Sequence, residues 1–223
     1  MATKLVATKL ARSDPEDILD EVIGLLEERG YDGWQLRDVA ERAHASLTTI
    51  YKHFPSREEL IVAAVERWMN EHVYQTIQDP SDDPSLAEAL IHILHKVFEP
   101  WEQHPTMLQV FVRARYTTGG QRLQSQGYAA VGPLSQLYAD KLDPTFAQDL
   151  TMILTNAVNG ALIRYLNGDI DITDILPNLE STVYRLNLTD ATTRTEPSRR
   201  KPRAPVRTPT NRQRKSLDTG KRG

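Results

Sequence analysis

Hydroxyl, phenolic and cationic side chains follow one another within a short stretch of the N-terminal quarter of the sequence. Thr48, Thr49, Tyr51, Lys52 and His53 form this stretch. Such groups donate hydrogen bonds to phosphate oxygens, and a threonine methyl group can also contact the methyl group of thymine. The stretch is therefore a candidate surface for binding double-stranded DNA.

Two short helices joined by a tight turn would position these side chains. The spacing of apolar residues predicts one helix over residues 36–43 and a second over 47–53. In a helix-turn-helix the second helix lies in the major groove, and the first crosses it closely. Val39 and Ile50 would face a small core, and Ala40 would let the two helices approach each other. The polar side chains would then point outward.

Longer helices are expected on both sides of this pair. The run Ser13-Asp14-Pro15-Glu16 suits the start of a first helix, because it offers a capping residue and a proline for the first turn, and Gly30 suits the end of this helix. Ser56 with Glu59 forms a capping box that begins a long fourth helix.

Apolar positions continue to recur at helical rather than alternating spacing through the rest of the body. Pro100 is expected to break one of these helices. The chain is therefore predicted to be all-α. The fourth helix is expected to run to about residue 78, and the later helices are expected at residues 86–98, 105–116, 121–142, 144–167 and 172–187.

Charge is distributed unevenly along the chain. Residues 190–223 contain 11 Lys/Arg and 3 Asp/Glu, so this tail has a net charge of +8. The whole chain has a net charge of −3, which leaves −11 for residues 1–189. The tail is poor in apolar residues and is expected to be disordered when free.

The sequence contains no cysteine, which excludes disulfides, thiolate metal sites and thiol nucleophiles. No stretch approaches the roughly 20 apolar residues that a membrane span requires. We therefore expect a soluble cytoplasmic protein.

The residues around the candidate surface carry a family resemblance. They read Val-Ala at 39–40, Ala-His-Ala-Ser at 43–46, Thr-Thr-Ile-Tyr-Lys-His-Phe at 48–54 and Ser-Arg-Glu-Glu-Leu at 56–60. This pattern resembles the DNA-binding segment of the TetR family of bacterial transcriptional repressors. His44 and Thr48 stand where that family usually has glycine. A left-handed turn costs histidine more than glycine, and Thr48 enlarges the surface that faces the bases.

The resemblance implies roles for individual residues of the candidate surface. Some would bind the phosphate backbone, and others would contact base edges. The expected phosphate-binding residues are Thr49, Tyr51, Lys52, His53 and Arg57, and the expected base-reading residues are Arg37, Leu47 and Thr48.

Aromatic residues and methionines recur at helical spacing in the C-terminal part of the chain. Each of them taken singly is best interpreted as a core residue. The resemblance nevertheless implies a cavity for a small molecule in this region, and the tract at 110–119 weakly resembles actinobacterial repressors of sterol and lipid breakdown. This resemblance implies a bulky lipophilic molecule or an acyl-CoA as the effector. The candidate lining residues are Trp68, Met69, Phe98, Trp101, Met107, Phe111, Tyr128, Asn156 and Asn159.

The last two helices are expected to pair with their copies in a second chain, because their apolar stripe is too broad for a monomer. The candidate contacts are Leu150, Ile153, Leu154, Val158, Leu162, Leu176, Leu179 and Val183.

A metal-dependent helical enzyme and a helical adaptor without DNA binding are the alternative functions. His92 and His95 lie three residues apart, but there is no cysteine, and the two Glu-x-x-His motifs that a di-iron helical site requires are not present as a pair. Phosphate-cradling glycine loops and nucleophile elbows are also missing. We expect no enzymatic activity, no metal and no cofactor.

The resemblance implies a ligand-responsive repressor that binds operator DNA as a homodimer in the cytoplasm, associated with the nucleoid. Four regions are expected: a basic arm (1–12), a DNA-binding domain (13–58), a helical ligand-binding and dimerisation domain (59–189) and the basic tail (190–223).

Overall fold

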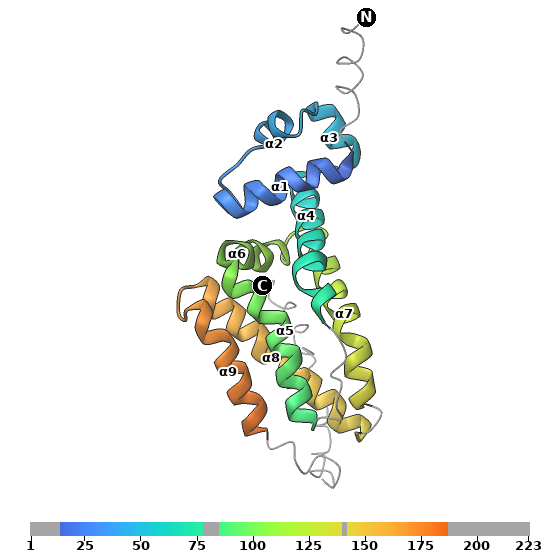
Figure 1. The fold of residues 1–223 in the computed structure, drawn as a ribbon, viewed down its shortest axis with the longest axis vertical. Helices are drawn as coiled ribbons and strands as arrows, with labels where there is room; N and C mark the ends of the chain where they lie inside the picture. The colour runs from blue at the N-terminus through green and yellow to red at the C-terminus, as the bar shows by residue number, and fades with distance from the viewer. Residues whose placement is uncertain (1–13, 78–84, 140–141, 187–223) are drawn as a thin grey trace, which may run out of the picture. The chain divides into compact units, whose positions relative to one another are not determined.

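The chain is helical throughout the part that the structure describes (Figure 1). This computed structural model describes residues 14–77, 85–139 and 142–186, all within one compact unit. No strand occurs in these ranges, so the prediction of an all-α fold is confirmed. None of the described helices is long and apolar enough to cross a membrane. The helices are α1 (Pro15–Arg29), α2 (Leu36–Arg42), α3 (Leu47–His53), α4 (Arg57–His72), the 3-10 helix η1 (Tyr74–Thr76), α5 (Leu86–Gln103), α6 (Pro105–Ala114), α7 (Gln121–Ala139), α8 (Pro144–Leu166) and α9 (Ile172–Arg185).

Helices α1, α2 and α3 form a small bundle, which we call the head. The helix ends follow from local chemistry: Asp14 caps α1, Pro15 occupies its first turn, and Gly30 ends it with a φ of 70°. Val39 on α2 and Ile50 on α3 are 0% and 1% exposed and share a core with α1. Burial of these two side chains turns the opposite faces of α2 and α3 outward.

Helix α4 joins the head to the helices that follow, which we call the body. Its N-terminus is capped by Ser56, which accepts a hydrogen bond from Glu59 N at 3.1 Å. The Glu59 carboxylate lies 2.7 Å from Arg122 of α7. Helix α4 packs against α1 of the head and against α6 and α7 of the body. The predicted domain boundary at 58/59 thus falls inside one continuous helix whose buried residues belong to a core shared by both regions.

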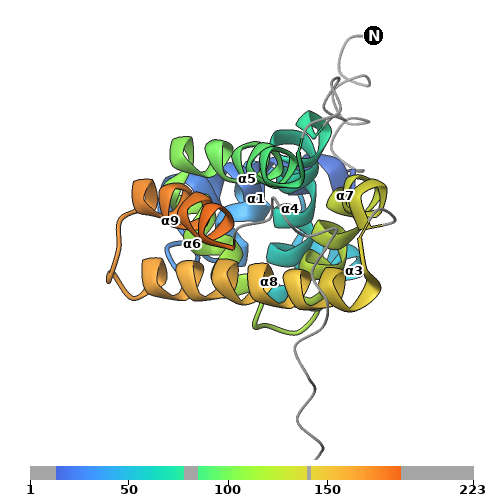
Figure 2. The same ribbon diagram turned by 90° about the horizontal axis from the view of Figure 1, so that it is seen from below.

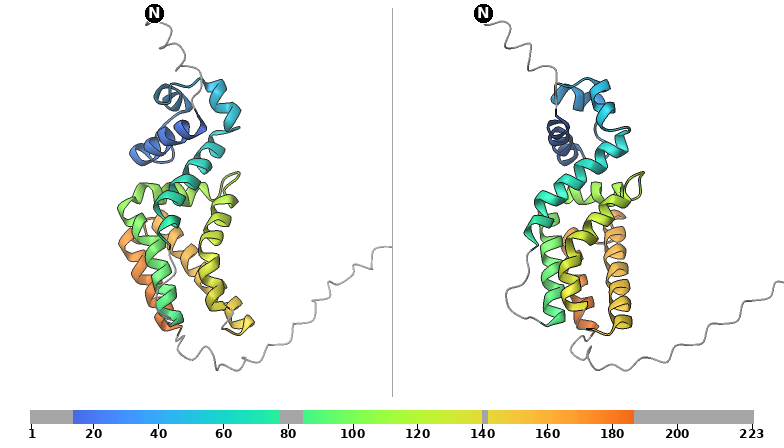
Figure 3. Two further views of the ribbon diagram at one scale, coloured as in Figure 1. Left: turned by 45° about the vertical axis from the view of Figure 1, so that its right-hand side comes forward. Right: turned by 90° about the vertical axis from the view of Figure 1, so that its right-hand side faces the viewer.

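Helix α9 lies at one side of the body and packs against both α5 and α8 (Figures 2 and 3). Helix α5 continues through Pro100 to Gln103, so the predicted break at Pro100 is wrong. Phe98 and Trp101, on either side of this proline, are buried, and their packing holds the helical path although one backbone donor is missing. The chain turns at His104, and Pro105 begins α6.

The predicted basic arm at 1–12 and the basic tail at 190–223 lie outside the described residues.

Candidate nucleic-acid interface

Helices α2 and α3 form a helix-turn-helix. The turn is closed by a hydrogen bond from Ala45 N to Ala40 O at 3.0 Å. His44 has a φ of 49°, which is the left-handed conformation expected at this position. Ser46 caps α3 by accepting a hydrogen bond from Thr49 N at 3.0 Å. The polar residues of the turn thus set the start and the direction of α3.

One face of the head carries most of the side chains that the sequence predicted to contact DNA. Thr49 is half-buried, and its hydroxyl lies 2.8 Å from that of Ser46, so it supports the helix cap. The other predicted residues of α2 and α3 are exposed. They are Arg37, Leu47, Thr48, Tyr51, Lys52 and His53.

Ion pairs divide the cations of the head into two sets. Arg42 donates two hydrogen bonds to the Glu28 carboxylate, at 3.0 and 2.6 Å, and ties α2 to α1. Arg29 lies 3.7 Å from Asp38. Within the described ranges, neither Arg37 nor Lys52 has a carboxylate at ion-pair distance. The charges of these two residues therefore remain available to a polyanion.

The side chain of Arg57, which the sequence predicted to contact phosphate, packs against two aromatic rings of the head. Its guanidinium carbon lies 4.3 Å from the centroid of the Trp34 ring and 5.4 Å from that of Tyr31. It also donates a hydrogen bond to the backbone carbonyl of Tyr31. Arginine stacks well on aromatic faces, so this arrangement braces the connection between α1 and α2 from the N-terminus of α4.

A second arginine reaches the same connection from the body. Arg113 of α6 lies 2.7 Å from the Asp32 carboxylate, and its guanidinium carbon lies 4.4 Å from the centroid of the Tyr31 ring. We call Arg113, Tyr31, Arg57 and Trp34 the clasp. It was not predicted, because its members are far apart in the sequence and share no local pattern. The clasp gives α6 a direct contact with the head.

The junction of head and body also contains several residues that were predicted to line a ligand cavity. Trp68 is fully buried, stacks on Trp101 with ring centroids 4.6 Å apart, and donates from Nε1 to Glu27 at 3.1 Å. These side chains fill a packed core in this structure. The predicted lining residues with this placement are Trp68, Met69, Phe98, Trp101 and Met107.

The remaining predicted lining residues lie on α6, α7 and α8. Phe111 packs against Trp101, and Asn159 accepts a hydrogen bond from Arg115 at 2.8 Å. Tyr128 and Asn156 face a surface groove of about 460 Å³ between the two helices. We call it the α7/α8 groove. Its lining residues are Tyr128, Ala147, Gln148, Thr151, Met152, Thr155 and Asn156.

The predicted dimer contacts separate into buried and exposed residues. Ile153 is exposed, whereas Leu154 and Val158 are partly buried. The other five pack inside this chain and have almost no surface left for a partner. They are Leu150, Leu162, Leu176, Leu179 and Val183. The apolar residues that α8 exposes are Met152, Ile153, Ile163 and Leu166.

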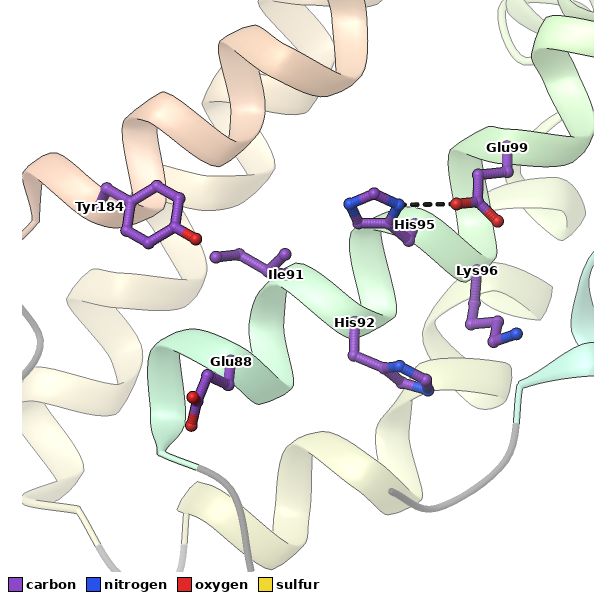
Figure 4. Close-up of a pocket in the computed structure, with 7 residues that line it drawn as sticks. All are labelled: Glu88, Ile91, His92, His95, Lys96, Glu99 and Tyr184. Carbon is purple, nitrogen blue, oxygen red and sulfur yellow. Dashed lines mark hydrogen bonds and ion pairs between the residues drawn. The ribbon is translucent and has the colours of Figure 1, made fainter. Parts of the chain in front are cut away.

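A second groove, of about 400 Å³, is lined by α5 and by Tyr184 of α9 (Figure 4). Near it, His95 has Nδ1 2.7 Å from the Glu99 carboxylate and Nε2 2.5 Å from that of Glu180. The contact with Glu99, followed by the one with Glu180, raises the pKa of His95 against the effect of burial. Within the described ranges, no three His, Asp or Glu side chains gather so as to hold a metal ion.

We expect the contribution of His95 to stability to decrease as the pH rises. Its folded pKa is raised, so the stabilisation is complete below the unfolded pKa of about 6.5 and is lost as the pH passes through the folded value. The side chain is 38% exposed, which limits the effect to about 1 kcal/mol at most. Urea unfolding of the wild type and of His95→Gln over this pH range measures it, with His92→Gln as the control. Identical pH slopes in the wild type and His95→Gln would contradict the expectation.

Comparison with known proteins covers both the head and the body. Residues 18–64 match the tetR family of bacterial regulatory proteins, and residues 84–186 match the tetracyclin repressor-like C-terminal domain. The first match contains the helix-turn-helix, and the second contains α5 to α9.

Individual proteins are also similar to this chain, in sequence or in fold, over most of its length. The HTH-type transcriptional repressor KstR of Rhodococcus jostii is 27% identical over 174 residues, which cover 76% of this chain and 80% of the relative. A TetR transcriptional regulator from Rhodococcus sp. RHA1 has a similar fold, with a TM-score of 0.58, 19% identity and coverage of 78% and 96% of the two chains. A TetR variant from Acinetobacter baumannii AYE in complex with minocycline has a TM-score of 0.59, 16% identity and coverage of 84% and 100%.

Proposed function

The chain belongs to the TetR family of bacterial regulatory proteins, and on this premise we propose that it is a dimeric repressor that leaves its operator when a small lipophilic effector binds. Members of this family are transcriptional regulators rather than enzymes, and so is this chain. The observation that carries the proposal is the exposed face of α2 and α3, where Arg37 and Lys52 have no carboxylate partner in the described ranges. Residues 13–58 would bind DNA, and residues 59–189 would bind the effector and the second chain.

Selection of binding sites from random duplexes tests the DNA-binding part of this proposal. A dimer with two heads should select a partly palindromic site. A mobility shift with the selected site, followed by a reporter gene placed behind it, then distinguishes repression from activation. Recovery of no sequence above background would contradict the proposed function.

The effector part rests on the arrangement of the body and on one structural neighbour. That neighbour was solved with minocycline, so the same fold holds a small molecule elsewhere. In this chain, the clasp and α4 connect the body to the head. An effector that binds one arrangement of the two heads more tightly would shift the population away from the DNA-binding state.

We expect Ile163→Glu to disrupt the dimer. Ile163 is 44% exposed and lies in the C-terminal part of α8, which also exposes Leu166. Two-fold symmetry places each substitution in the interface twice, so the dimer dissociation constant should rise by more than about 100-fold. Sedimentation at micromolar concentration measures the change. Tyr116→Glu, at a side chain that is 68% exposed and lies outside α8 and α9, is the control. Equal dimer constants for both variants would exclude this face.

The basic tail lies outside the described residues, and its role follows from its charge of +8. We propose that it binds phosphates beside the operator. Truncation after Thr195 should leave the selected sequence unchanged and lower the affinity. The slope of log K against log salt should flatten by about 0.9 for each phosphate that the tail neutralises in the full-length protein. A full-length variant with the tail arginines and lysines replaced by glutamine separates charge from length, and superimposable slopes for all three proteins would contradict this role.

A further inference from the structure

Arg115, at the C-terminal end of α6, carries a charge that no carboxylate of the described residues balances. Its side chain donates to Asn159 Oδ1 at 2.8 Å, and its guanidinium carbon lies 5.5 Å from the centroid of the Phe111 ring. Both partners are neutral. By contrast, Arg113 and Arg122 each lie 2.7 Å from a carboxylate oxygen. A half-buried guanidinium without a counter-charge is strongly stabilised by a bound anion.

A further donor lies beside Arg115. Asn159 accepts the hydrogen bond from Arg115 through its carbonyl oxygen, and its amide NH2 group has no partner in the described part of the chain. This NH2 group can therefore donate to the same anion as Arg115.

A surface groove lies beside Asn159 along α8. Asn156 precedes Asn159 by three residues, so both lie on the same face of α8. Asn156 lines the α7/α8 groove together with Tyr128 and Met152. A molecule that reaches Asn159 can therefore extend into this groove.

We propose that the effector is an amphipathic organic anion whose carboxylate or phosphate group binds Arg115 and Asn159 and whose apolar part lies in the α7/α8 groove. This inference rests on the proposed function, because it names the class of molecule that the repressor senses. The position of the bound anion also suggests how its binding could affect the DNA-binding head. Helix α6 holds Arg115 at one end of its last turn and Arg113, a member of the clasp, two residues earlier. An anion bound by Arg115 would therefore act on the helix that touches the head.

Matched acids and alcohols test the proposal. The probes are dodecanoate, dodecyl phosphate and dodecanol, with 1-pyrenebutyrate and 1-pyrenebutanol as a bulkier pair, all below the concentrations at which micelles form. Calorimetric titration of the full-length dimer gives the acid-to-alcohol ratio of affinities. Arg115→Gln keeps hydrogen-bond donors and removes the charge, whereas Arg115→Lys keeps the charge. Arg185→Gln, on the exposed surface of α9, is the control for loss of one cation.

At least one acid should bind the wild type about 10-fold more tightly than its alcohol, as expected for a charged hydrogen bond. The ratio should fall to about 1 in Arg115→Gln, recover in Arg115→Lys and stay unchanged in Arg185→Gln. An acid-to-alcohol affinity ratio near 1 for every pair in the wild type would overturn the proposal. A ratio in Arg115→Gln equal to that in the wild type would also overturn it. Dissociation of the Arg115→Gln dimer would overturn it too, because the counter-charge would then come from the second chain.

Binding to the operator recovered by selection tests the proposed function separately from the anion site. Acid preference through Arg115 in a protein that selects no DNA sequence would leave the anion site intact and refute the repressor. Operator binding without acid preference would refute the anion site and leave the repressor intact. Release of the operator by the acid, and not by its alcohol, would support both.

Discussion

Substitution of Lys52 by alanine is expected to weaken operator binding about 30-fold and to do so equally for all DNA sequences. Lys52 is exposed on α3 and has no carboxylate partner in the described ranges. A surface contact between a lysine and a phosphate contributes about 1 kcal/mol, and a dimer contains two such contacts. The slope of log K against log salt should flatten by about 1.8, which is about 0.9 for each head. Mobility shifts at several salt concentrations measure both quantities.

Arg37→Ala should have a different effect from Lys52→Ala. If Arg37 reads a base edge, its loss should relax sequence preference at one position of each half-site by about 1 to 3 kcal/mol. Tyr51→Phe removes only the phenolic hydroxyl, and it should weaken all sequences equally.

Arg42→Ala is the matched control for these variants. It removes one positive charge from the same head, but this charge is already paired with Glu28. We expect little change in the salt slope. The DNA-binding assignment would fail if Tyr51→Phe and Lys52→Ala together left the affinity unchanged, or if Arg42→Ala lowered it as much as Lys52→Ala.

Trp68→Ala should lower the free energy of unfolding by about 3 to 5 kcal/mol. Trp68 is fully buried between the head and the body, stacks on Trp101 and His72, and donates a hydrogen bond to Glu27. Truncation would leave a large cavity at this junction and remove one of the hydrogen-bond donors of Glu27, whose carboxylate also lies 3.4 Å from His104 Nδ1. Because domains are stable by only about 5 to 15 kcal/mol, this variant should unfold at a much lower temperature. Thermal and urea unfolding measure the loss.

Two other variants define the origin of the effect. Trp68→Phe keeps an aromatic ring and loses the hydrogen bond to Glu27, so it should cost much less than alanine. Tyr116→Ala, at an exposed aromatic side chain, should change stability by less than about 0.5 kcal/mol. A loss in Trp68→Ala no larger than that in Tyr116→Ala would mean that the junction does not stabilise the fold.

The sequence determined the features of this protein that depend on near neighbours. Asp14, Gly30 and Ser46 act at helix ends through contacts that span only a few residues. The alternation of Val39 and Ile50 with polar neighbours determined which sides of α2 and α3 would be buried, because the helical period is local. For this reason the helix-turn-helix and its exposed face were predictable.

Only the tertiary structure decided how residues of the same type differ. Lys52 and Arg57 are both cations near the end of the motif, but Arg57 is stacked on Trp34 and held by Tyr31, more than 20 residues away. Arg113 and Arg115 lie two residues apart, yet one faces Asp32 of the head and the other Asn159 of α8. Local spacing contains no information about such partners, because each contact depends on how separate helices pack.

The same reason explains the predicted dimer contacts. An amphipathic pattern shows that a helix buries one stripe, but it does not show whether the covering surface belongs to the same chain or to another. In α9, Leu176, Leu179 and Val183 are covered by this chain itself, whereas Ile163 of α8 stays exposed. The burial of an apolar side chain has the same free energy whichever surface covers it, so only the packing of the complete chain separates the core from the surface left for a partner.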